Sequence, residues 1–260
     1  MMVSKDSMMA TNLVISQART GSTRLPDKVL LKILGKEILL HLIDRVLAAE
    51  TVDHMIIATT DSPKDDVIID LVDDYHRKVS VFRGSEEDVL DRYYQAALAV
   101  RDTFDDQLNI IRITSDCPLI DPKVIDLHVR EFERRSVDYL SSRITKRTWP
   151  HGMELEIFTF ASLKKAWQQA TIASDREHVT PYIYMTANDQ FNIYEFPYRE
   201  DLSHYRLTID YLEDYQLIKT IFEKLYPHHP HFDLNDIIKL LRDNPELSRI
   251  NSERHNTKIL

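Results

Sequence analysis

The sequence is poor in cysteine and glycine and has no long apolar run. One cysteine among 260 residues excludes an intramolecular disulfide framework, and no apolar stretch approaches the ~20 residues that a membrane-spanning helix needs. The glycines are too widely spaced for the G-x-G-x-x-G or G-x-x-x-x-G-K-[ST] motifs, which argues against dinucleotide-binding and P-loop ATPase sites. With so few glycines, we expect each to occupy a position where the backbone requires it: Gly21, Gly35, Gly84 and Gly152.

Positive charge is also scarce over the chain as a whole. Lys and Arg number 33 against 42 Asp and Glu, a formal net charge of -9. This balance disfavours non-specific attachment to nucleic acid or to an anionic membrane, so we expect neither as a partner. The first residues lack a continuous apolar segment followed by a small-residue cleavage site, and a cytoplasmic location is therefore expected.

Short apolar segments rich in β-branched residues alternate with amphipathic segments. In the first half they predict strands at 12–18, 54–60, 78–82 and 108–116, and helices at about 36–50, 63–77, 86–103 and 122–135. In the second half, strands are predicted at 153–158, 191–196 and 205–210, and helices near 159–170, 174–187, 212–225 and 233–243. This order favours a three-layer α/β arrangement with a mostly parallel sheet and right-handed crossovers.

The sequence predicts a single main domain, because no segment divides the chain. The 43% hydrophobic content is enough for a substantial core, and no low-complexity linker or internal repeat divides the sequence. We predict a flexible tail at 1–11, a single domain at 12–245 with a small lobe at about 137–200, and a peripheral tail at 246–260.

The loop after the first predicted strand is strongly basic. Residues 19–36 carry a net charge of +4, from Arg19, Arg24, Lys28, Lys32 and Lys36 against Asp27. Open parallel sheets bind ligands at the carboxyl ends of their strands, so this loop predicts a local anion site. Gly21 would allow an unusual backbone angle and close approach of a phosphate. A solvated surface loop is the alternative.

Two aspartates follow later predicted strands. Asp116 lies just beyond residues 108–114, at the carboxyl end of the predicted strand, and Asp210 ends the strand at 205–210, with Asp214 one helical turn further on. A carboxylate beside a bound phosphate usually holds Mg²⁺, which takes only one or two protein ligands. Each aspartate alone would more often be a cap. Together with the basic loop they predict a site for a metal triphosphate.

Five separated motifs carry a resemblance to a known family. The segments are SQARTGSTRLPDKVL, VFRGSEEDVLDRYYQA, RITSDCPLIDP, REHVTPYI and RLTIDYLEDYQLI, which occur in the expected order between about residues 12 and 225. They resemble the motifs of the SpsF family of spore coat polysaccharide biosynthesis proteins. That family is similar to the sugar-acid cytidylyltransferases that make CMP-Kdo and CMP-sialic acid.

The resemblance implies an α/β/α, Rossmann-like fold of the nucleotide-diphospho-sugar transferase type, an activity that joins CTP to an acceptor with release of pyrophosphate, a Mg²⁺ cofactor, and a possible homodimer. It implies catalytic roles for Arg19, Lys28, Asp116 and Asp210, the two aspartates binding the metal. It also implies that nucleotide-binding residues are Gly21, Ser22 and Arg24 at the triphosphate and Arg83, Gly84, Ser85, Asp91 and Arg92 near the cytosine.

Two polar segments are candidates for the acceptor site. The first has Arg143, Lys146, Arg147 and His151 before Glu154 and Glu156, and the second has Arg176, Glu177 and His178. Cations suit an acidic sugar or a phosphorylated small molecule, and carboxylates suit its hydroxyls or an amine. The alternatives are a solvent-exposed turn for the first segment and a capped helix start, Ser174 with Glu177, for the second.

Three functions remain open at this point. The first is a Mg²⁺-dependent cytidylyltransferase for surface polysaccharide or glycan synthesis. The second is a glycosyltransferase of the same fold, which would release a nucleoside diphosphate. The third is a catalytically silent nucleotide-binding protein, against which the presence of Lys28 and both aspartates argues. Cys117 is expected to pack in the core, and the histidines at 226–232 are expected to lie in a surface loop.

Overall fold

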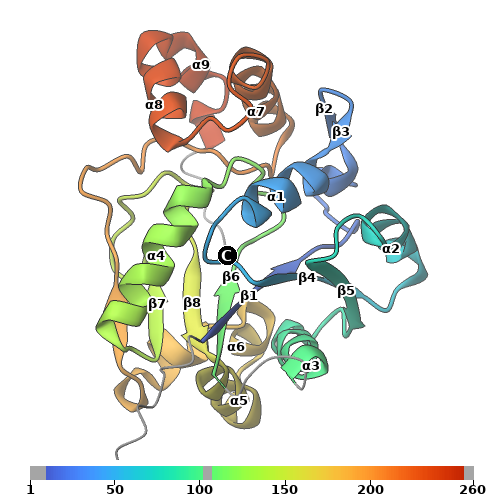
Figure 1. The fold of residues 1–260 in the computed structure, drawn as a ribbon, viewed down its shortest axis with the longest axis vertical. Coiled ribbons are helices and arrows are strands. Elements are labelled where there is room, and N and C mark those ends of the chain that lie inside the picture. The colour runs from blue at the N-terminus through green and yellow to red at the C-terminus, as the bar shows by residue number, and fades with distance from the viewer. Residues whose placement is uncertain (1–9, 102–106, 255–260) are drawn as a thin grey trace, which may run out of the picture.

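The computed structural model describes residues 10–101 and 107–254 (Figure 1). Within these residues a seven-stranded central sheet has the order β5-β4-β1-β6-β8-β7-β9. Its strands in chain order are β1 (Thr11–Gln17), β4 (His54–Thr60), β5 (Val79–Gly84), β6 (Leu108–Arg112), β7 (Tyr139–Ser141), β8 (Glu156–Thr159) and β9 (Ile193–Glu195). Only β8 runs antiparallel to its neighbours, β6 and β7, so the predicted mostly parallel sheet is confirmed.

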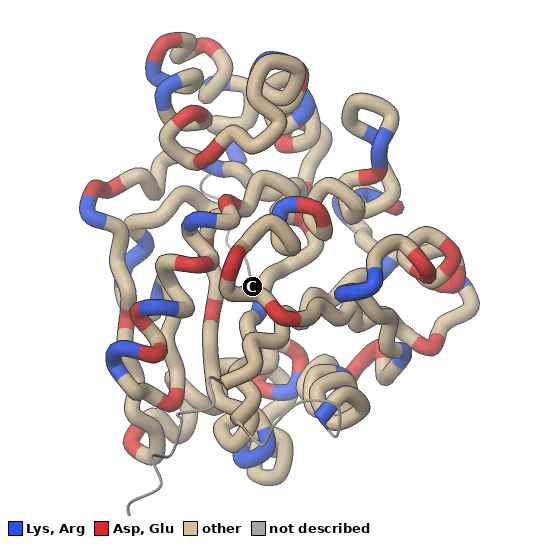
Figure 2. Tube along the Cα trace, in the orientation of Figure 1, with Lys and Arg blue, Asp and Glu red and all other residues tan. Residues whose placement is uncertain are grey.

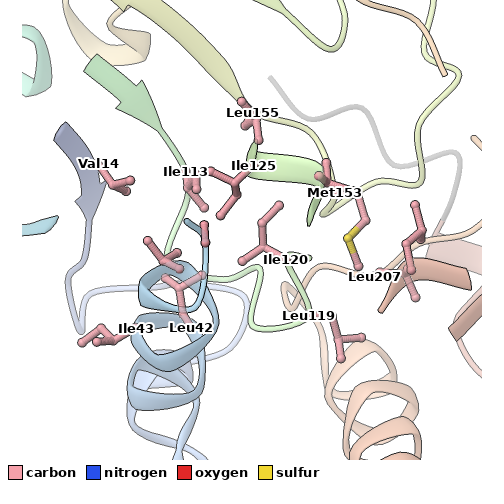
Figure 3. Close-up of a cluster of buried hydrophobic side chains, with 14 of the residues drawn as sticks. Val14, Leu42, Ile43, Ile113, Leu119, Ile120, Ile125, Met153, Leu155 and Leu207 are labelled. Atoms are coloured by element: carbon pink, nitrogen blue, oxygen red, sulfur yellow. The ribbon is translucent and has the colours of Figure 1, made fainter. Parts of the chain in front are cut away.

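Helices cover both faces of this sheet because its strands are apolar on both sides. Val14 of β1 belongs to one buried cluster, and its neighbours Leu13 and Ile15 belong to the other. The first cluster packs against α1 (Ile38–Leu47), α2 (Asp66–Val72), α4 (Pro122–Arg135), α7 (Leu212–Leu225), α8 (Leu234–Asp243) and α9 (Pro245–Arg249). The second packs against α3 (Val89–Arg101) and α5 (Phe160–Gln169), and α6 (Ala173–His178) lies against α3. Figure 3 shows part of the first cluster, where side chains from β1, α1 and α4 converge.

The C-terminal helices gather at one end of the molecule beside α1 (Figure 1). The ring of His41 in α1 lies tilted against that of Phe222 in α7, with ring centroids 4.5 Å apart, and the Arg45 guanidinium donates to the carbonyl of Phe232. Asp121 joins two helix starts, because its carboxylate accepts from the backbone N–H of Lys123 in α4 and of Leu234 in α8. These contacts bind the last helices to the main body.

Most predicted elements are present, and four differ. The helix predicted at 63–77 is an α-helix only over Asp66–Val72, after a 3₁₀ turn at Pro63–Asp65. The strand predicted at 108–116 ends at Arg112, and the helix predicted at 174–187 stops at His178. Pro181 has no N–H to continue α6, and a single π-helical turn, Tyr182–Thr186, follows it. The segment 205–210 is not a strand of the sheet; it makes one isolated bridge, between Arg206 and His151.

The prediction for 205–210 was wrong because its alternation has another cause. Leu207 and Ile209 are buried in the core as expected, but Arg206 and Asp210 on the opposite side are also buried. Those polar side chains face a hydrogen-bonded network instead of solvent. Polar and apolar residues therefore alternate as they would in a strand, although this segment pairs with no strand of the sheet.

The predicted peripheral tail at 246–260 is also corrected in part. Leu247 and Asn251 are buried, and the Asn251 amide donates to the backbone carbonyl of Arg206 and to Asp214. A buried polar network needed that donor, which a composition-based prediction does not detect. Residues 255–260, most of the predicted tail at 1–11, and the end of the helix predicted at 86–103 lie outside the described residues.

The sheet places two loops at its topological switch point. From β1 the chain moves outward to β4 and β5, then returns to β6 on the other side of β1. The loops that leave the carboxyl ends of β1 and β6 therefore diverge and leave a crevice between them. The basic loop follows β1 and Asp116 follows β6, so both border this crevice.

The charges are distributed in both signs over the molecule. Figure 2 shows Lys and Arg interspersed with Asp and Glu around the trace. Among the residues that the structure describes, no helix combines the length and apolar character required to cross a bilayer.

Candidate active site

The basic loop is anchored to the body by a buried carboxylate. Asp65, which follows β4, accepts hydrogen bonds from the backbone N–H and the hydroxyl of Thr20, both at 2.8 Å. Burial opposes ionisation of Asp65, but its hydrogen bonds from Thr60 and Thr20 lower its pKa below the usual value. At the other end of the loop, Val29 is buried in the core beside Lys28. These two anchors hold the cationic segment over the crevice.

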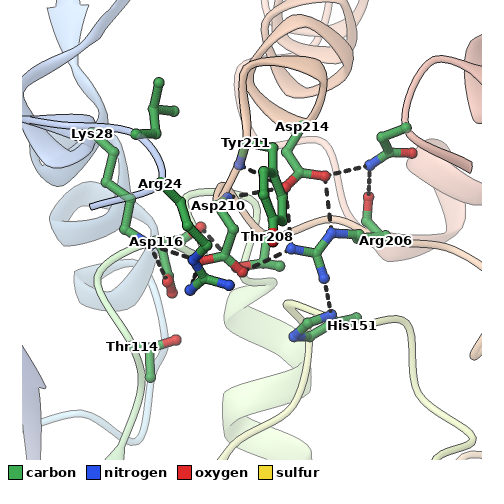
Figure 4. A network of polar contacts seen from close by, with 12 residues as sticks. Arg24, Lys28, Thr114, Asp116, His151, Arg206, Thr208, Asp210, Tyr211 and Asp214 are labelled. Atoms are coloured by element: carbon green, nitrogen blue, oxygen red, sulfur yellow. Dashed lines mark hydrogen bonds and ion pairs between the residues drawn. The ribbon is translucent and has the colours of Figure 1, made fainter. Parts of the chain in front are cut away.

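Lys28 lies between the two predicted aspartates. Its Nζ is 2.7 Å from Oδ2 of Asp116 and 3.0 Å from Oδ1 of Asp210. Arg24 Nη2 contacts the same Oδ1 of Asp210 at 2.8 Å. Figure 4 shows these side chains pointing toward one another from three separate parts of the chain. The structure therefore brings together the residues whose convergence the sequence predicted.

The electrostatics of this group keep Lys28 and Asp116 charged. Burial lowers the pKa of Lys28, but the negative charges of Asp116 and Asp210 outweigh burial and raise that pKa above its usual value. Burial likewise raises the pKa of Asp116, and the Lys28 ammonium more than offsets this, so the pKa of Asp116 lies well below its usual range. At neutral pH the aspartate is a carboxylate and the lysine an ammonium.

Asp210 is held from behind by a second, buried network. Arg206 donates from Nη2 to Oδ2 of Asp210 at 2.7 Å and from Nε to Oδ1 of Asp214 at 2.9 Å. Asp214 is fully buried and also accepts from the backbone N–H groups of Asp210 and Tyr211, both at 3.0 Å. The carboxylate of Asp214 thus fixes the turn that carries Asp210 at the start of α7. Arg206 and Asp214 act as supports behind the cavity-facing residues.

Two cavities meet at this cluster. The larger, of about 840 Å³, is lined by the basic loop, the residues after β5 and the start of the Asp116 loop. The second, of about 480 Å³, lies between the Asp116–Asp210 pair and the lobe that carries β7 and β8. Four residues line both cavities: Arg24, Thr114, Asp116 and His178.

The smaller cavity combines cations with paired carboxylates. Arg112 Nη1 lies 2.6 Å from Glu156, and Arg147 Nε lies 2.8 Å from Glu154. Burial raises the pKa of Glu154, although the neighbouring Arg147 partly opposes the rise. Arg143 also lines the cavity, and its guanidinium forms no ion pair with any carboxylate of the described residues. The Arg143 guanidinium therefore remains available to pair with an anionic ligand.

Comparison with known proteins decides the family. A family model described as cytidylyltransferase matches residues 13–240. The chain belongs to the cytidylyltransferase family.

Individual relatives agree over most of the length of this cytidylyltransferase. It is 33% identical over 247 residues to the spore coat polysaccharide biosynthesis protein SpsF of Bacillus subtilis, covering 90% of this chain and 95% of that protein. It is 39% identical over 245 residues to an uncharacterised protein of Methanocaldococcus jannaschii, covering 92% and 93%. The resemblance to the SpsF family is thereby confirmed.

Solved structures show the same fold. A cytidylyltransferase from Leptospira borgpetersenii matches with a TM-score of 0.81 at 32% identity, over 96% of this chain and 98% of that chain. A CMP:2-keto-3-deoxy-manno-octonic acid synthetase, solved in complex with CTP, matches with a TM-score of 0.61 at 18% identity, over 83% and 99%. The predicted α/β nucleotidyltransferase fold is confirmed.

Most predicted site residues line one of the two cavities of this cytidylyltransferase. The larger cavity includes Arg19, Gly21, Ser22, Arg24, Lys28, Arg92, Asp116, Glu177 and His178. The smaller includes Arg147, Glu154, Glu156 and Asp210 together with the four shared residues. Lys32 and Lys36 of the basic segment instead pair with Glu37 and Asp44, away from both cavities.

Five predicted residues do not line either cavity. The Arg83 guanidinium donates to the carbonyls of Thr60, Asp61 and Ser62, and the Asp91 carboxylate accepts from Trp167. Arg176 joins α6 to Asp88 and to the carbonyl of Trp167. Gly84 and Ser85 lie behind the cavity-lining Arg92: a Cβ on Gly84 would stand 3.0 Å from the Arg92 side chain, and the Ser85 carbonyl accepts from its Nη1.

Gly21 differs from the expectation that the backbone requires each glycine, whereas Gly152 meets it. Gly21 has no positive φ, and a Cβ there would meet no atom within 4 Å, so the backbone alone does not require a glycine. Gly152 has φ +100°, and a Cβ there would lie 2.5 Å from the carbonyl oxygen of Leu207. This close approach lets the loop that carries His151 and Glu154 pack against the Asp210 segment. Gly152 is thus a site-forming residue that spacing rules did not identify.

Several contributors gave no signal in the sequence. Arg206 falls in a pattern that predicted a strand, and Arg112 falls inside a true strand. Glu86 and Glu87 line the larger cavity and Tyr184 lines the smaller one. Their roles depend on which loops meet in space, so no local spacing could have identified them.

Proposed function

We propose that this cytidylyltransferase transfers a cytidylyl group from CTP to an acidic sugar or a phosphorylated small-molecule acceptor, releasing pyrophosphate. The observation that carries the proposal is that two cavities share the Asp116 edge and the Lys28–Asp116–Asp210 cluster borders it. A nucleotide in the larger cavity and an acceptor in the smaller one would meet at the shared residues. Similarity to the spore coat polysaccharide biosynthesis protein SpsF of Bacillus subtilis supports a place in polysaccharide synthesis.

The residues at the junction suit in-line attack on the α-phosphorus. The acceptor oxygen forms the new P–O bond while the bond to pyrophosphate breaks, and charge develops on the phosphate oxygens. Arg19, Arg24 and Lys28 line the larger cavity on the triphosphate side. Cations positioned in advance stabilise this charge without reorganising, and binding both reactants in adjoining cavities supplies the orientation.

The donor set fits Mg²⁺. Asp116 and Asp210 direct carboxylate oxygens at one position, where the Lys28 ammonium now lies, so both oxygens already surround a cation. In the described residues no group of three or more His, Cys, Asp or Glu is arranged to hold a metal, but Mg²⁺ commonly takes one or two carboxylates together with substrate phosphates and waters. Asp116 and Asp210 would hold the ion, which would neutralise charge on the triphosphate.

The smaller cavity supports an anionic acceptor. Arg143 has no carboxylate partner among the described residues, whereas Arg112 and Arg147 are each neutralised by a glutamate. A carboxylate or phosphate of the acceptor would supply the missing counter-charge. Glu154 and Glu156 remain able to accept hydrogen bonds from acceptor hydroxyls.

The test begins with the nucleotide. We expect CTP with Mg²⁺ to raise the melting temperature more than ATP, GTP or UTP, because a ligand that binds only the folded state stabilises it by mass action. The protein is then incubated with CTP, Mg²⁺ and a panel of acidic sugars and sugar phosphates. Formation of a CMP conjugate by mass, with one pyrophosphate for each conjugate, is the expected result.

Other outcomes would contradict the proposal. Release of a nucleoside diphosphate from a nucleotide sugar would indicate a glycosyltransferase. Selective CTP binding with no conjugate from any panel member, and no pyrophosphate, would favour a nucleotide-binding protein without this activity.

A further inference from the structure

We infer that His178 is the general base that takes the proton from the attacking hydroxyl of the acceptor. The inference rests on the proposed function and assigns a residue to a step that the reaction requires. A neutral hydroxyl that attacks phosphorus must lose its proton, and a positioned side chain can accept it in the transition state. The base must reach the acceptor at the place where the two cavities join.

Position selects His178 from the residues at that junction. Only four residues of the described chain line both cavities. Arg24 is a permanent cation, and the hydroxyl of Thr114 is not a base at neutral pH. Asp116 is engaged by Lys28 at 2.7 Å, an ion pair that would have to break before its carboxylate could accept a proton. The imidazole of His178 is the shared group that can take up a proton.

The imidazole of His178 is also free to accept a proton. Among the described residues, no group forms a hydrogen bond with a ring nitrogen of His178, and the side chain is half-buried. His151, the other histidine of the smaller cavity, differs on both counts. Arg206 Nη1 donates to its Nδ1 at 2.9 Å, and burial together with the charges of Arg147 and Arg206 lowers the pKa of His151 to about 3.

The remaining carboxylates are placed or paired differently. Glu154 and Glu156 are held by Arg147 and Arg112 at 2.8 and 2.6 Å. Glu177, the residue before His178, lines only the nucleotide cavity. None of the three combines a free proton-accepting group with a place at the junction.

The backbone around His178 is held in an unusual conformation. Val179 has φ 74° and ψ -54°, and the N–H of Thr180 donates to the carbonyl of His178 at 2.9 Å, which closes a γ-turn of the rare positive-φ type. The Val179 side chain is buried, and Thr180 Oγ1 donates to Glu156 at 2.8 Å. A β-branched residue adopts positive φ only where its surroundings enforce it, and such positions concentrate at functional sites. The turn directs His178 and Thr180 into adjoining parts of the site.

The charges that face His178 come from both cavities. On the nucleotide side they are Arg19, Arg24, Lys28, Glu86, Glu87, Arg92, Asp116 and Glu177. On the acceptor side they are Arg112, Arg143, Arg147, His151, Glu154, Glu156, Tyr184 and Asp210. Both signs are represented on each side, so neither cavity presents His178 with charges of a single sign.

The step balances without any further reactant. The acceptor oxygen bonds to the α-phosphorus, the bond from that phosphorus to pyrophosphate breaks, and the hydroxyl proton moves to the His178 imidazole. The imidazolium then returns the proton to solvent when the products leave.

The pH dependence of turnover tests the assignment. In the unaltered protein, log kcat for CMP-conjugate formation should fall by about one per pH unit on the acidic side, because a protonated imidazole cannot accept the hydroxyl proton. In His178→Gln, kcat should fall by about 100-fold or more and this acidic limb should disappear. CTP should raise the melting temperature of the variant as it does that of the unaltered protein, which shows that the fold and the nucleotide cavity are intact. His228→Ala, which removes an exposed histidine from the loop after α7, is the matched control and should leave the profile unchanged.

Chemical rescue separates proton transfer from binding. Added imidazole should restore part of the turnover of His178→Gly, because it can occupy the vacated space and accept the proton. A variant that raises only the acceptor KM and keeps the acidic limb would overturn the inference and leave the proposed function standing. Failure of the unaltered protein to form a CMP conjugate from any acceptor would overturn both.

Discussion

The ammonium of Lys28 contacts two carboxylates that lie 88 and 182 residues away in the chain. In the absence of ligand it is their counter-ion, and the side chains of Lys28 and Asp210 are only 13% and 6% exposed. A triphosphate with its cation would compete for the same partners. The same residue can therefore neutralise the empty site and then serve the nucleotide, which makes it the most informative single position to change.

Loss of either member of this pair should abolish most of the activity. We expect Lys28→Ala and Asp116→Ala each to lower turnover by at least ~100-fold, by analogy with the loss of one stabilising contact to developing charge, about 2.7–4 kcal/mol. Pyrophosphate release with a confirmed acceptor measures the effect. Lys32→Ala is the matched control, because this lysine belongs to the same basic segment but is 60% exposed and pairs with Glu37. Near-normal turnover in either site variant would contradict the assignment.

The buried support behind Asp210 should matter for stability. Asp214 is fully buried and bonded to Arg206, so removing its charge in Asp214→Asn would leave a buried guanidinium poorly compensated. We expect a loss of about 3–5 kcal/mol in the free energy of unfolding, measured with urea. The neighbouring Glu213→Gln is the control, since its pair with Arg254 is more exposed and should contribute less than about 1 kcal/mol. Equal losses in the two variants would rule out a special role for Asp214.

At the scale of elements, the loop that carries His151, Gly152 and Glu154 packs closely against the segment 205–210. Gly152 lies against the backbone of Leu207, and this contact keeps His151 and Glu154 next to the Asp210 segment. Gly35, in the turn between β2 (Lys32–Ile33) and β3 (Lys36–Glu37), has a positive φ as well but open space around its α-carbon. Comparing substitutions at Gly35 and Gly152 therefore distinguishes the effect of a positive φ from the effect of a close backbone contact.

Alanine at these two positions should have unequal effects. Gly35→Ala should cost only the strain of a left-handed residue, about 1–2 kcal/mol. Gly152→Ala adds a clash with the carbonyl of Leu207 at 2.5 Å, so its loss of unfolding free energy should be larger by about 1–3 kcal/mol. Urea unfolding measures both, and turnover should fall only in Gly152→Ala. A Gly152→Ala protein as stable and as active as Gly35→Ala would show that the loop can move away without consequence.

At the scale of the whole molecule, buried histidines make the fold sensitive to acid. His128 of α4 is fully buried, where it contacts the Val124 carbonyl and Ser142, and burial lowers its pKa from 6.5 to about 4. Its folded pKa is below its unfolded value, so between these two pH values the unfolded chain binds more protons. Stability from this residue is complete above pH 6.5 and is lost as the pH falls toward 4.

This linkage predicts the size of one part of acid unfolding. The change from 6.5 to about 4 corresponds to about 3 kcal/mol between pH 7 and pH 4. In His128→Gln, which can keep polar contacts but does not titrate, the fall in unfolding free energy over this range should be smaller by about that amount. Urea titrations of both proteins at several pH values measure it, and parallel curves would refute the assignment.

How much the sequence alone could predict depends on the distance over which each feature is decided. The helices at 122–135 and 212–225 match the structure at both ends, because Asp121 and Pro122 mark a start locally and the apolar spacing is continuous. The helix predicted at 174–187 ends at His178, because Val179 leaves the helical conformation at a positive φ and Pro181 has no N–H to continue the helix. The segment 205–210 failed as a strand because contacts from elsewhere satisfy its polar groups: Asp214 and His151 bond the Arg206 side chain, and Asn251 bonds the Arg206 carbonyl.

The sequence by itself determined the α/β class, the basic loop, and the identity of the two carboxylates, because these follow from periodicity, local charge and strand ends. Only the tertiary structure decided that Arg206 and Gly152 build the site, that Arg83, Asp91 and Arg176 lie outside both cavities, and that His178 stands where the cavities join. The physical reason is that those features depend on which segments, distant in the sequence, pack against one another in the fold. Periodicity describes one element at a time, whereas a buried network is satisfied only by donors and acceptors that the whole fold assembles.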